Sequence, residues 1–154
     1  MKSIKKLILS FGYALQGFVF CIKSCRNFRI HTVAAALVLW VTHFYDFNKT
    51  DYAVIILTIG TVISFEAMNT ALEEACQTEI SERVKHAKDS AAAAVLCSAI
   101  FSVIIAVFMF FDINAFLKIV DYFKYTPINL LYFAIATVIA LVYIFYEDIF
   151  KHGK

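Results

Sequence analysis

Proline, glycine and charged side chains are all scarce in this chain. Its 154 residues include one proline and four glycines, and 17% of them carry a formal charge. Soluble domains have about a quarter of their residues charged, so this composition excludes an ordinary soluble domain. So few breakers also exclude a flexible linker or a low-complexity segment. Because the glycines stand at the isolated positions 12, 17, 60 and 153, the glycine-rich loop of P-loop and kinase-type nucleotide sites is excluded as well.

The cysteines and the net charge exclude further kinds of site. Cys21, Cys25, Cys76 and Cys97 show no C-x-x-C spacing, so they indicate neither a zinc site nor a disulfide framework. Cys21 and Cys25 are four residues apart and share a face if that segment is helical, but two thiols do not supply the four ligands of a structural zinc site. A net charge of +2 is too small to indicate nucleic-acid binding.

Long apolar runs are what the chain does contain. Hydrophobic residues make up 62% of it, and four runs stand out, at about 32–47, 52–72, 91–111 and 128–146. Each approaches or reaches the roughly 20 residues that a helix needs to cross a bilayer, and the first is the shortest. An apolar segment in lipid must satisfy its own backbone, which favours helices. The sequence therefore predicts an all-α integral membrane protein with four transmembrane helices.

Residues 1–31 differ from these runs because basic and apolar residues are interleaved there. The apolar side chains recur at spacings of three and four, and six lysines and arginines lie among them. This pattern is typical of an amphipathic basic helix on a membrane surface. A cleaved signal peptide is the alternative, but Gln16, Lys23 and Arg26 interrupt the apolar stretch that it would need. We therefore expect an N-terminal surface helix over residues 1–31.

The distribution of basic residues predicts the orientation in the membrane. With four crossings, residues 1–31, the 73–90 loop and the C-terminus share one side, which holds eleven lysines and arginines, whereas the other side holds three. The side richer in basic residues is the cytoplasmic one, so both termini and the 73–90 loop are expected in the cytoplasm. On the opposite side, residues 112–126 alternate polar and apolar positions and predict a short interfacial helix that ends before Pro127.

A polar cluster interrupts the end of the second apolar run. At about 100° per residue, its side chains project within roughly a 100° arc of one helix face. They are Glu66, Asn69, Thr70, Glu73 and Gln77. Ionisable groups at membrane depth are costly and usually functional. Carboxylates are suitable ligands for Mg²⁺, and the deeper Glu66 suits the role of a general base.

The segment after this cluster adds a basic side chain. The chain returns to the membrane through Lys88 and Asp89, and a lysine there can neutralise phosphate charge. The alternative is purely structural: Glu66 and Glu73 form ion pairs with Lys88 or Arg26, and Asp89 or Ser90 caps the third transmembrane helix. The functional interpretation is favoured because Glu66 lies inside an apolar run.

Several short motifs together match one known family. They are Gly12-Tyr13, Gly17, Asn27-Phe28-Arg29-Ile30-His31, Glu66-Ala67-Met68-Asn69-Thr70-Ala71-Leu72-Glu73, Ala87-Lys88-Asp89 and the alanine-rich opening Ala91 to Leu96. Over residues 5–111 the chain resembles the small integral-membrane diacylglycerol kinases and undecaprenol kinases of bacteria. The pairing of the glutamate-asparagine motif with Ala-Lys-Asp is specific, and the Asn27–His31 run is similar to the undecaprenol kinase branch.

The resemblance implies an activity, an assembly and a role for each site residue. Members of this family are homotrimers with a surface helix and three transmembrane helices per subunit. They transfer the γ-phosphate of ATP, with Mg²⁺, to the hydroxyl of a membrane lipid alcohol. Carried over, Glu66 is the candidate base and Glu73 a metal ligand. Asn69 is a phosphate or lipid contact, and Lys88 and Asp89 are nucleotide contacts. The expected location is the bacterial inner membrane, with undecaprenol preferred over diacylglycerol as the substrate.

Three features depart from the family pattern. The resemblance places a second metal ligand, normally a glutamate, at Cys25, and a thiol is a poor Mg²⁺ ligand. The acidic residue that normally follows the motif falls on the neutral Gln77. The fourth transmembrane helix is one that the family usually lacks. The chain thus divides into a lipid kinase-like domain, 1–111, and an addition, 112–154, made of the interfacial segment and the extra C-terminal transmembrane helix.

These departures leave two functions open. In the first, the protein is an ATP- and Mg²⁺-dependent lipid kinase in which Glu73, phosphate oxygens and water hold the metal. In the second, it is a catalytically weakened or silent relative that binds lipid or nucleotide in the membrane. A small transporter with Glu66 as a relay is disfavoured, because the polar cluster lies at one end of a crossing and not at its midplane. The kinase is the preferred prediction.

Overall fold

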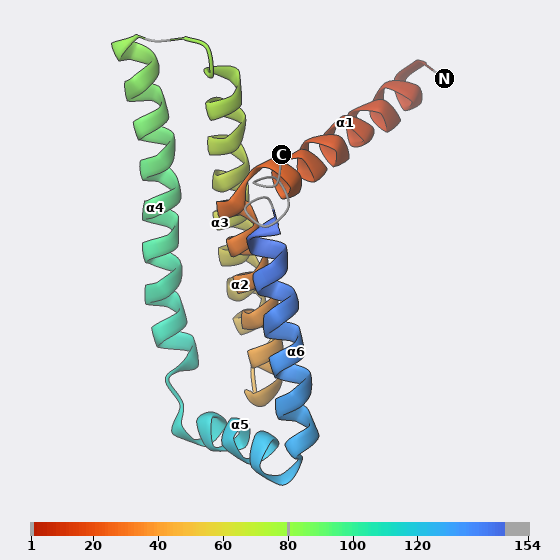
Figure 1. Cartoon of the computed structure of the whole chain (residues 1–154), viewed down its shortest axis with the longest axis vertical. Coiled ribbons are helices and arrows are strands. Elements are labelled where there is room, and N and C mark those ends of the chain that lie inside the picture. Colours follow the sequence, from red (N-terminus) through yellow and green to blue (C-terminus); the bar gives the residue numbers. More distant parts are fainter. Residues whose placement is uncertain (1, 80, 147–154) are drawn as a thin grey trace.

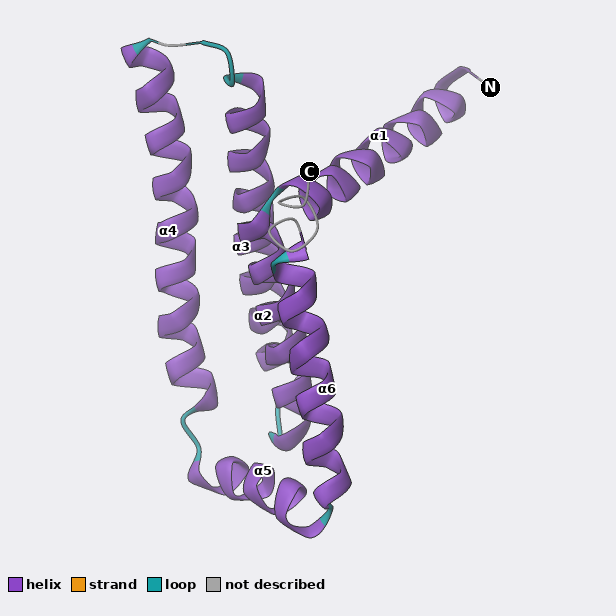
Figure 2. Cartoon of the chain, in the orientation of Figure 1, coloured by secondary structure: helices purple, strands orange, loops and turns teal. Residues whose placement is uncertain are grey.

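The structure, a computed structural model, describes residues 2–79 and 81–146. Every regular element in this part of the chain is a helix. In chain order the elements are α1 (Lys2–Ser24), α2 (Arg26–Val41), the 3₁₀ helix η1 (Thr42–Phe44), α3 (Lys49–Ala75), α4 (Glu82–Phe110), α5 (Ile113–Tyr125) and α6 (Pro127–Ile144). Short loops join them (Figures 1 and 2). The predicted all-α fold is confirmed, while the C-terminal tail from residue 147 lies outside the described residues.

Two long antiparallel helices form one side of the molecule, and shorter helices pack beside them. α3 and α4 have 27 and 29 residues, and α3 also packs against α2. α6 packs along α2, while α5 crosses the end of the bundle and links α4 to α6 (Figure 1). α1 leaves the bundle obliquely, at the level where α6 ends (Figure 1). Most apolar side chains remain exposed in this arrangement, as expected for helices that lipid surrounds.

Polar side chains before α3 and α4 fix where these helices begin. Asn48 accepts hydrogen bonds from the backbone N–H groups of Thr50 and Asp51. In return the Asp51 carboxylate accepts one from the Asn48 N–H at 2.8 Å, which completes a capping box. Ser81 caps α4 by accepting a hydrogen bond from the Val84 N–H. These caps satisfy donors that have no partner in the first helical turn.

The elements predicted after the third apolar run are close to those observed. α5 begins after Asp112, whose carboxylate accepts a hydrogen bond from the Asn114 N–H at 2.8 Å. α6 begins at Pro127, a residue whose missing N–H is harmless in the first turn. Lys118 pairs with Asp46 at 2.9 Å, so α5 is tied back to the segment before α3. The C-terminal addition is thus a pair of helices folded against α2.

The predicted 73–90 loop is wrong, because most of it is helical. Only residues 76–81 connect α3 to α4. An apolar run marks the part of a helix that lipid covers, and the helix continues into water wherever its residues allow it. The cap at Ser81 therefore starts α4 well before the apolar run predicted at 91–111. Asp89 consequently lies inside α4 and does not cap it.

The single surface helix predicted over residues 1–31 is also wrong, because the chain breaks at Cys25. The Cys25 backbone is extended, with φ −116° and ψ 112°, and it separates α1 from α2. As a result, the Arg26–Val41 helix replaces the crossing predicted at about 32–47. Basic residues in the first turn of α2 belong to the helix but not to the apolar run, so hydropathy alone places its start too late.

Four helices in the described part of the chain are long and apolar enough to cross a membrane. They are α1 from Ile4 onward, α3, α4 and α6. The predicted number is confirmed, but the membership differs. α2 has 16 residues, about 24 Å of helix at 1.5 Å per residue, which is shorter than the roughly 30 Å of a hydrocarbon core. The surface position of α1 stays a prediction, favoured by the lysines along it.

Arg29 ties the C-terminal helix to the N-terminal ones. Its side chain is 2% exposed. Nε donates a hydrogen bond to the Ile144 carbonyl at 3.0 Å, and Nη1 donates to the carbonyls of Ile22 and Lys23 at 3.0 and 3.1 Å. These carbonyls lie in the last turns of α6 and α1, where backbone acceptors lack helical partners and the helix dipole favours a cation. One guanidinium thus holds the ends of two helices together.

We expect Arg29→Met to lower the free energy of unfolding by about 2–4 kcal/mol, because it removes a buried charged donor that serves three carbonyls. The midpoint of thermal unfolding in detergent micelles measures the effect. Lys23→Met is the matched control, since it removes an exposed charge from the same junction. Equal midpoints for the two variants would contradict the role of Arg29.

Candidate active site

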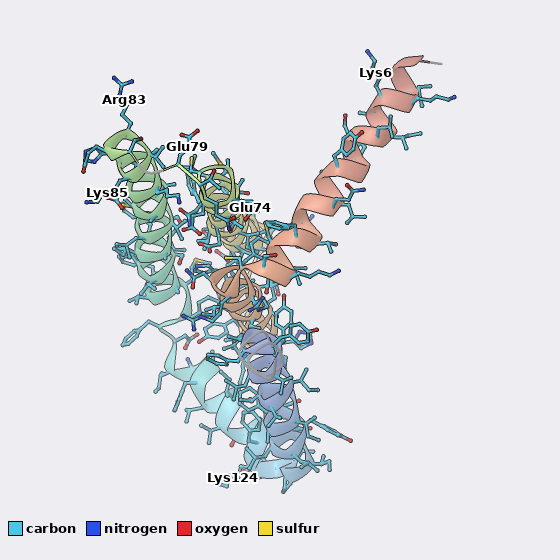
Figure 3. The ribbon with its side chains drawn as sticks, turned by 45° about the horizontal axis from the view of Figure 1, so that its top comes forward. Lys6, Glu74, Glu79, Arg83, Lys85 and Lys124 are labelled. Carbon is cyan, nitrogen blue, oxygen red and sulfur yellow. The ribbon has the colours of Figure 1, made fainter. Side chains whose placement is uncertain are left out.

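A polar cleft of about 640 Å³ lies where α1 meets α2, α3 and α4. The side chains that line it are Phe20, Ser24, Cys25, Arg26, Asn27, Arg29, Thr70, Glu73, Glu74, Gln77 and Lys88. Figure 3 shows Glu74 at this level, with Glu79, Arg83 and Lys85 beyond it toward the turn between α3 and α4, and Lys124 at the opposite end of the molecule. The cleft therefore gathers cations and carboxylates from three helices, α2, α3 and α4, while α1 contributes Phe20 and Ser24.

Glu66 is buried beside this cleft, with 1% of its surface exposed. Its Oε1 accepts a hydrogen bond from the Cys25 thiol at 3.2 Å, whereas its Oε2 has no hydrogen-bond partner among the described residues. Among the described residues, neither Glu66 nor Glu73 forms an ion pair. A buried carboxylate oxygen without a partner is costly and points to a ligand that the chain does not supply.

One turn further along α3, Asn69 orients Glu73. The Asn69 Nδ2 donates a hydrogen bond to Glu73 Oε1 at 2.9 Å. Asn69 Oδ1 is a second buried oxygen for which the described part of the chain supplies no partner. Thr70 uses its hydroxyl within the helix, donating to the Glu66 carbonyl at 2.9 Å. Glu66, Asn69 and Thr70 are buried, while Glu73 is exposed. The predicted polar face thus runs from a buried carboxylate to one that water reaches.

Cys25 connects the break between α1 and α2 to Glu66. Its Sγ accepts a hydrogen bond from the Phe28 N–H at 3.5 Å, as the N-cap of α2, and donates one to Glu66. Burial raises the pKa of the Cys25 thiol above its ordinary value, so the thiol keeps its proton at neutral pH and can donate. The metal-ligand role that the resemblance places at this position stays a prediction.

Lys88 and Asp89 take different positions on α4. Lys88 is half-buried and lines the cleft together with Glu73. Asp89 is exposed and does not line the cleft, because consecutive residues on a helix point about 100° apart. Its role as a nucleotide contact stays a prediction. The predicted site residues that the structure brings together in or beside the cleft are Cys25, Glu66, Asn69, Glu73 and Lys88.

The sequence profile of the family described as prokaryotic diacylglycerol kinase matches residues 12–110. The chain belongs to this family. A diacylglycerol kinase of Synechocystis sp. is 38% identical to it over 103 residues, which cover 64% of this chain and 59% of the relative. An undecaprenol kinase of Bacillus subtilis is 32% identical over 110 residues, covering 70% of this chain and 89% of the relative. The chain thus spans less than two thirds of the Synechocystis protein, and no solved structure matches it significantly.

The part that matches the diacylglycerol kinase family contains the whole cleft. Residues 12–110 run from the middle of α1 to the end of α4, so α5 and α6 lie beyond the match. Two further residues of the cleft, Asn27 and Arg29, are indicated in the sequence only by the Asn27–His31 run. The burial of Arg29 depends on its contact with α6, which is distant in the sequence, so no local pattern predicts it.

Magnesium, which the resemblance to diacylglycerol kinases implies, fits Glu73 as its protein ligand. The described residues contain no group of three His, Cys, Asp or Glu side chains that could hold a metal. Mg²⁺ is usually bound through one or two carboxylates, with water and substrate phosphates completing its shell. Glu73, already oriented by Asn69, and Glu74 line the cleft and meet this requirement. When bound, the metal neutralises phosphate charge.

We expect Glu66→Met to raise the free energy of unfolding by about 1–2 kcal/mol, because a buried oxygen without a partner disappears and the volume is kept. Thermal unfolding in micelles measures the change. Glu79→Met, at an exposed position in the turn between α3 and α4, is the control. A large loss of stability in Glu66→Met would mean that the carboxylate serves the fold instead of a ligand.

Proposed function

We propose that the protein is a lipid kinase that transfers the γ-phosphate of ATP, with Mg²⁺, to the hydroxyl of a membrane lipid alcohol. Undecaprenol is the preferred substrate and diacylglycerol the next. The observation that carries the proposal is the buried Glu66. No described residue is a hydrogen-bond partner of its Oε2, and the side chain lies beside a cleft lined by cations. Membership in the diacylglycerol kinase family supports the same chemistry.

The proposed reaction assigns a step to each of three side chains. Glu66 Oε2 takes the proton of the lipid hydroxyl while that oxygen bonds to the γ-phosphorus, and the bond between this phosphorus and the bridging oxygen of ADP breaks. Lys88 compensates the phosphate charge from α4. Glu73, held by Asn69, binds the metal that accompanies the nucleotide. The products are ADP and the lipid phosphate, with the proton on Glu66 until water removes it.

The two substrates reach Glu66 from different sides. A cavity of about 240 Å³ between α2, α3 and α4 is lined mainly by apolar side chains, including Val62, one turn from Glu66. The chain of a lipid alcohol suits this cavity, while ATP enters the polar cleft from water. The preference for undecaprenol is supported by the Asn27–His31 run and by the Bacillus subtilis undecaprenol kinase, 89% of which is covered.

The membrane arrangement is part of the proposal. Basic residues gather at the end of the bundle with the cleft, which supports a cytoplasmic position for that end in a bacterium, where ATP is available. The membrane is then the inner one. The resemblance implies a homotrimer. α4 offers a surface for contacts between subunits, because none of its residues is buried within the single chain.

A second candidate function rests on the replacement of two carboxylates. Cys25 and Gln77 stand where the resemblance leads us to expect acidic residues, so a silent relative that binds lipid or nucleotide without turnover is the alternative. The two functions differ in one measurable property, the transfer of phosphate to a lipid alcohol.

A phosphorylation assay tests the proposal. Purified protein in mixed micelles receives ATP labelled at the γ-phosphate, Mg²⁺ and either undecaprenol or diacylglycerol. We expect labelled lipid with both alcohols and a higher kcat/KM for undecaprenol. Because a general base contributes about 10²–10⁴-fold, Glu66→Gln should lower kcat by that factor. Glu73→Gln should raise the Mg²⁺ concentration needed for half-maximal activity.

The control for this assay is Glu79→Gln, an exposed glutamate outside the cleft, which should retain the wild-type rate. Nucleotide binding without labelled lipid in the wild type would reject the kinase and favour the silent relative. Equal rates for undecaprenol and diacylglycerol would reject the substrate preference alone.

A further inference from the structure

The carboxylate of Glu66 has a single side-chain hydrogen bond among the described residues, and Cys25 supplies it. The contact joins positions 41 residues apart, with the Cys25 Sγ donating to Glu66 Oε1 at 3.2 Å. The other oxygen, Oε2, is buried and unpartnered. A carboxylate tied through one oxygen cannot rotate freely about its terminal bond. The thiol therefore decides which oxygen faces the space where a substrate hydroxyl must lie.

The thiol itself is held firmly from both sides of the helix break. The Cys25 N–H donates to the Cys21 carbonyl at 3.0 Å, which continues the bonding of α1. The Phe28 N–H donates to the thiol sulfur at 3.5 Å, which begins α2. Phe28 is fully buried and packs edge-on against Phe18, with ring centroids 5.3 Å apart. A side chain fixed in this way suits the orientation of a reacting group, which needs rigid support.

We propose that Cys25 is a positioning residue that orients the Glu66 carboxylate, so that Oε2 is presented to the substrate hydroxyl. The inference rests on the proposed function of Glu66 as the base. In this proposal Cys25 orients Glu66 and does not bind the metal, which is the role that the resemblance leads us to expect at this position. A thiol is a weak, neutral donor, so it fixes the geometry of Glu66 while leaving the charge on the carboxylate for proton transfer.

Kinetics of two Cys25 variants test this role. Cys25→Ala removes the donor, and we expect kcat to fall about tenfold through misorientation of the base, with an unchanged KM for ATP and an unchanged Mg²⁺ requirement. Cys25→Ser keeps a donor at the same place and should retain most of the wild-type kcat. Cys97→Ala, at an exposed position on α4, is the matched control and should behave as wild type.

The outcomes separate positioning from the other roles of this residue. Wild-type kcat in Cys25→Ala, or an equal loss in both variants, would overturn the proposal. A raised Mg²⁺ requirement in Cys25→Ala would overturn it in favour of metal binding. Cys25→Ala also removes the cap of α2 and so lowers the midpoint of unfolding. A kcat that falls in Cys25→Ala and is retained in Cys25→Ser supports the positioning role, because a loss of stability alone does not produce this difference.

An infrared measurement tests the same contact without any activity. The difference spectrum between wild type and Cys25→Ser isolates the S–H stretching band of Cys25, which lies at lower wavenumber when the thiol donates a hydrogen bond. We expect the band to move to higher wavenumber when the same pair is compared in the Glu66→Met background. If no lipid is phosphorylated, the proposed function fails, but the S–H band still tests the contact between Cys25 and Glu66. A shift of the band supports the orientation of Glu66 by Cys25, and an unmoved band overturns it.

Discussion

A carboxylate buried at the edge of the membrane is the constraint on which the site depends. Taking an ion out of water costs several kcal/mol even in a relaxed protein interior, and Glu66 is almost completely enclosed. Hydrogen bonding from the surrounding residues offsets this desolvation cost only in part. α2 brings one thiol to Oε1, and no described side chain reaches Oε2. The remaining cost is consistent with the proposed role of Glu66 as the base, which needs one oxygen available to a reactant.

The break between α1 and α2 follows from the same constraint. The extended backbone at Cys25 turns the chain and lets a single residue end one helix, begin the next and reach Glu66. The packing of Phe28 against Phe18 then holds the two helices at that angle. Local backbone geometry and the chemistry of the site are therefore fixed together.

Sequence reasoning succeeded where the physics is local. The spacing of Glu66, Asn69 and Glu73 determines a common helix face, and α3 confirms this part of the prediction. Gln77, predicted on the same face, lies beyond the end of α3. The ends of helices proved harder, because the cap at Ser81 begins α4 in polar sequence that hydropathy assigns to a loop. The contact of Cys25 with Glu66 had no local signal. It depends on a helix break without proline or glycine and on packing between segments far apart in the chain.

The three hydrogen bonds of Arg29 have a consequence for the order of synthesis. Their acceptors are carbonyls near residues 22 and 144, and the bond to Ile144 spans 115 positions. Because the chain is synthesised from its N-terminus, Arg29 and its two acceptors in α1 exist before Ile144 does, so the junction beside the cleft lacks one of its carbonyl partners until α6 is made. Contacts between such distant positions form late because their loop must close first. The contact between Arg29 and Ile144 is therefore the last of the three to form, and synthesis of α6 completes the junction beside the cleft.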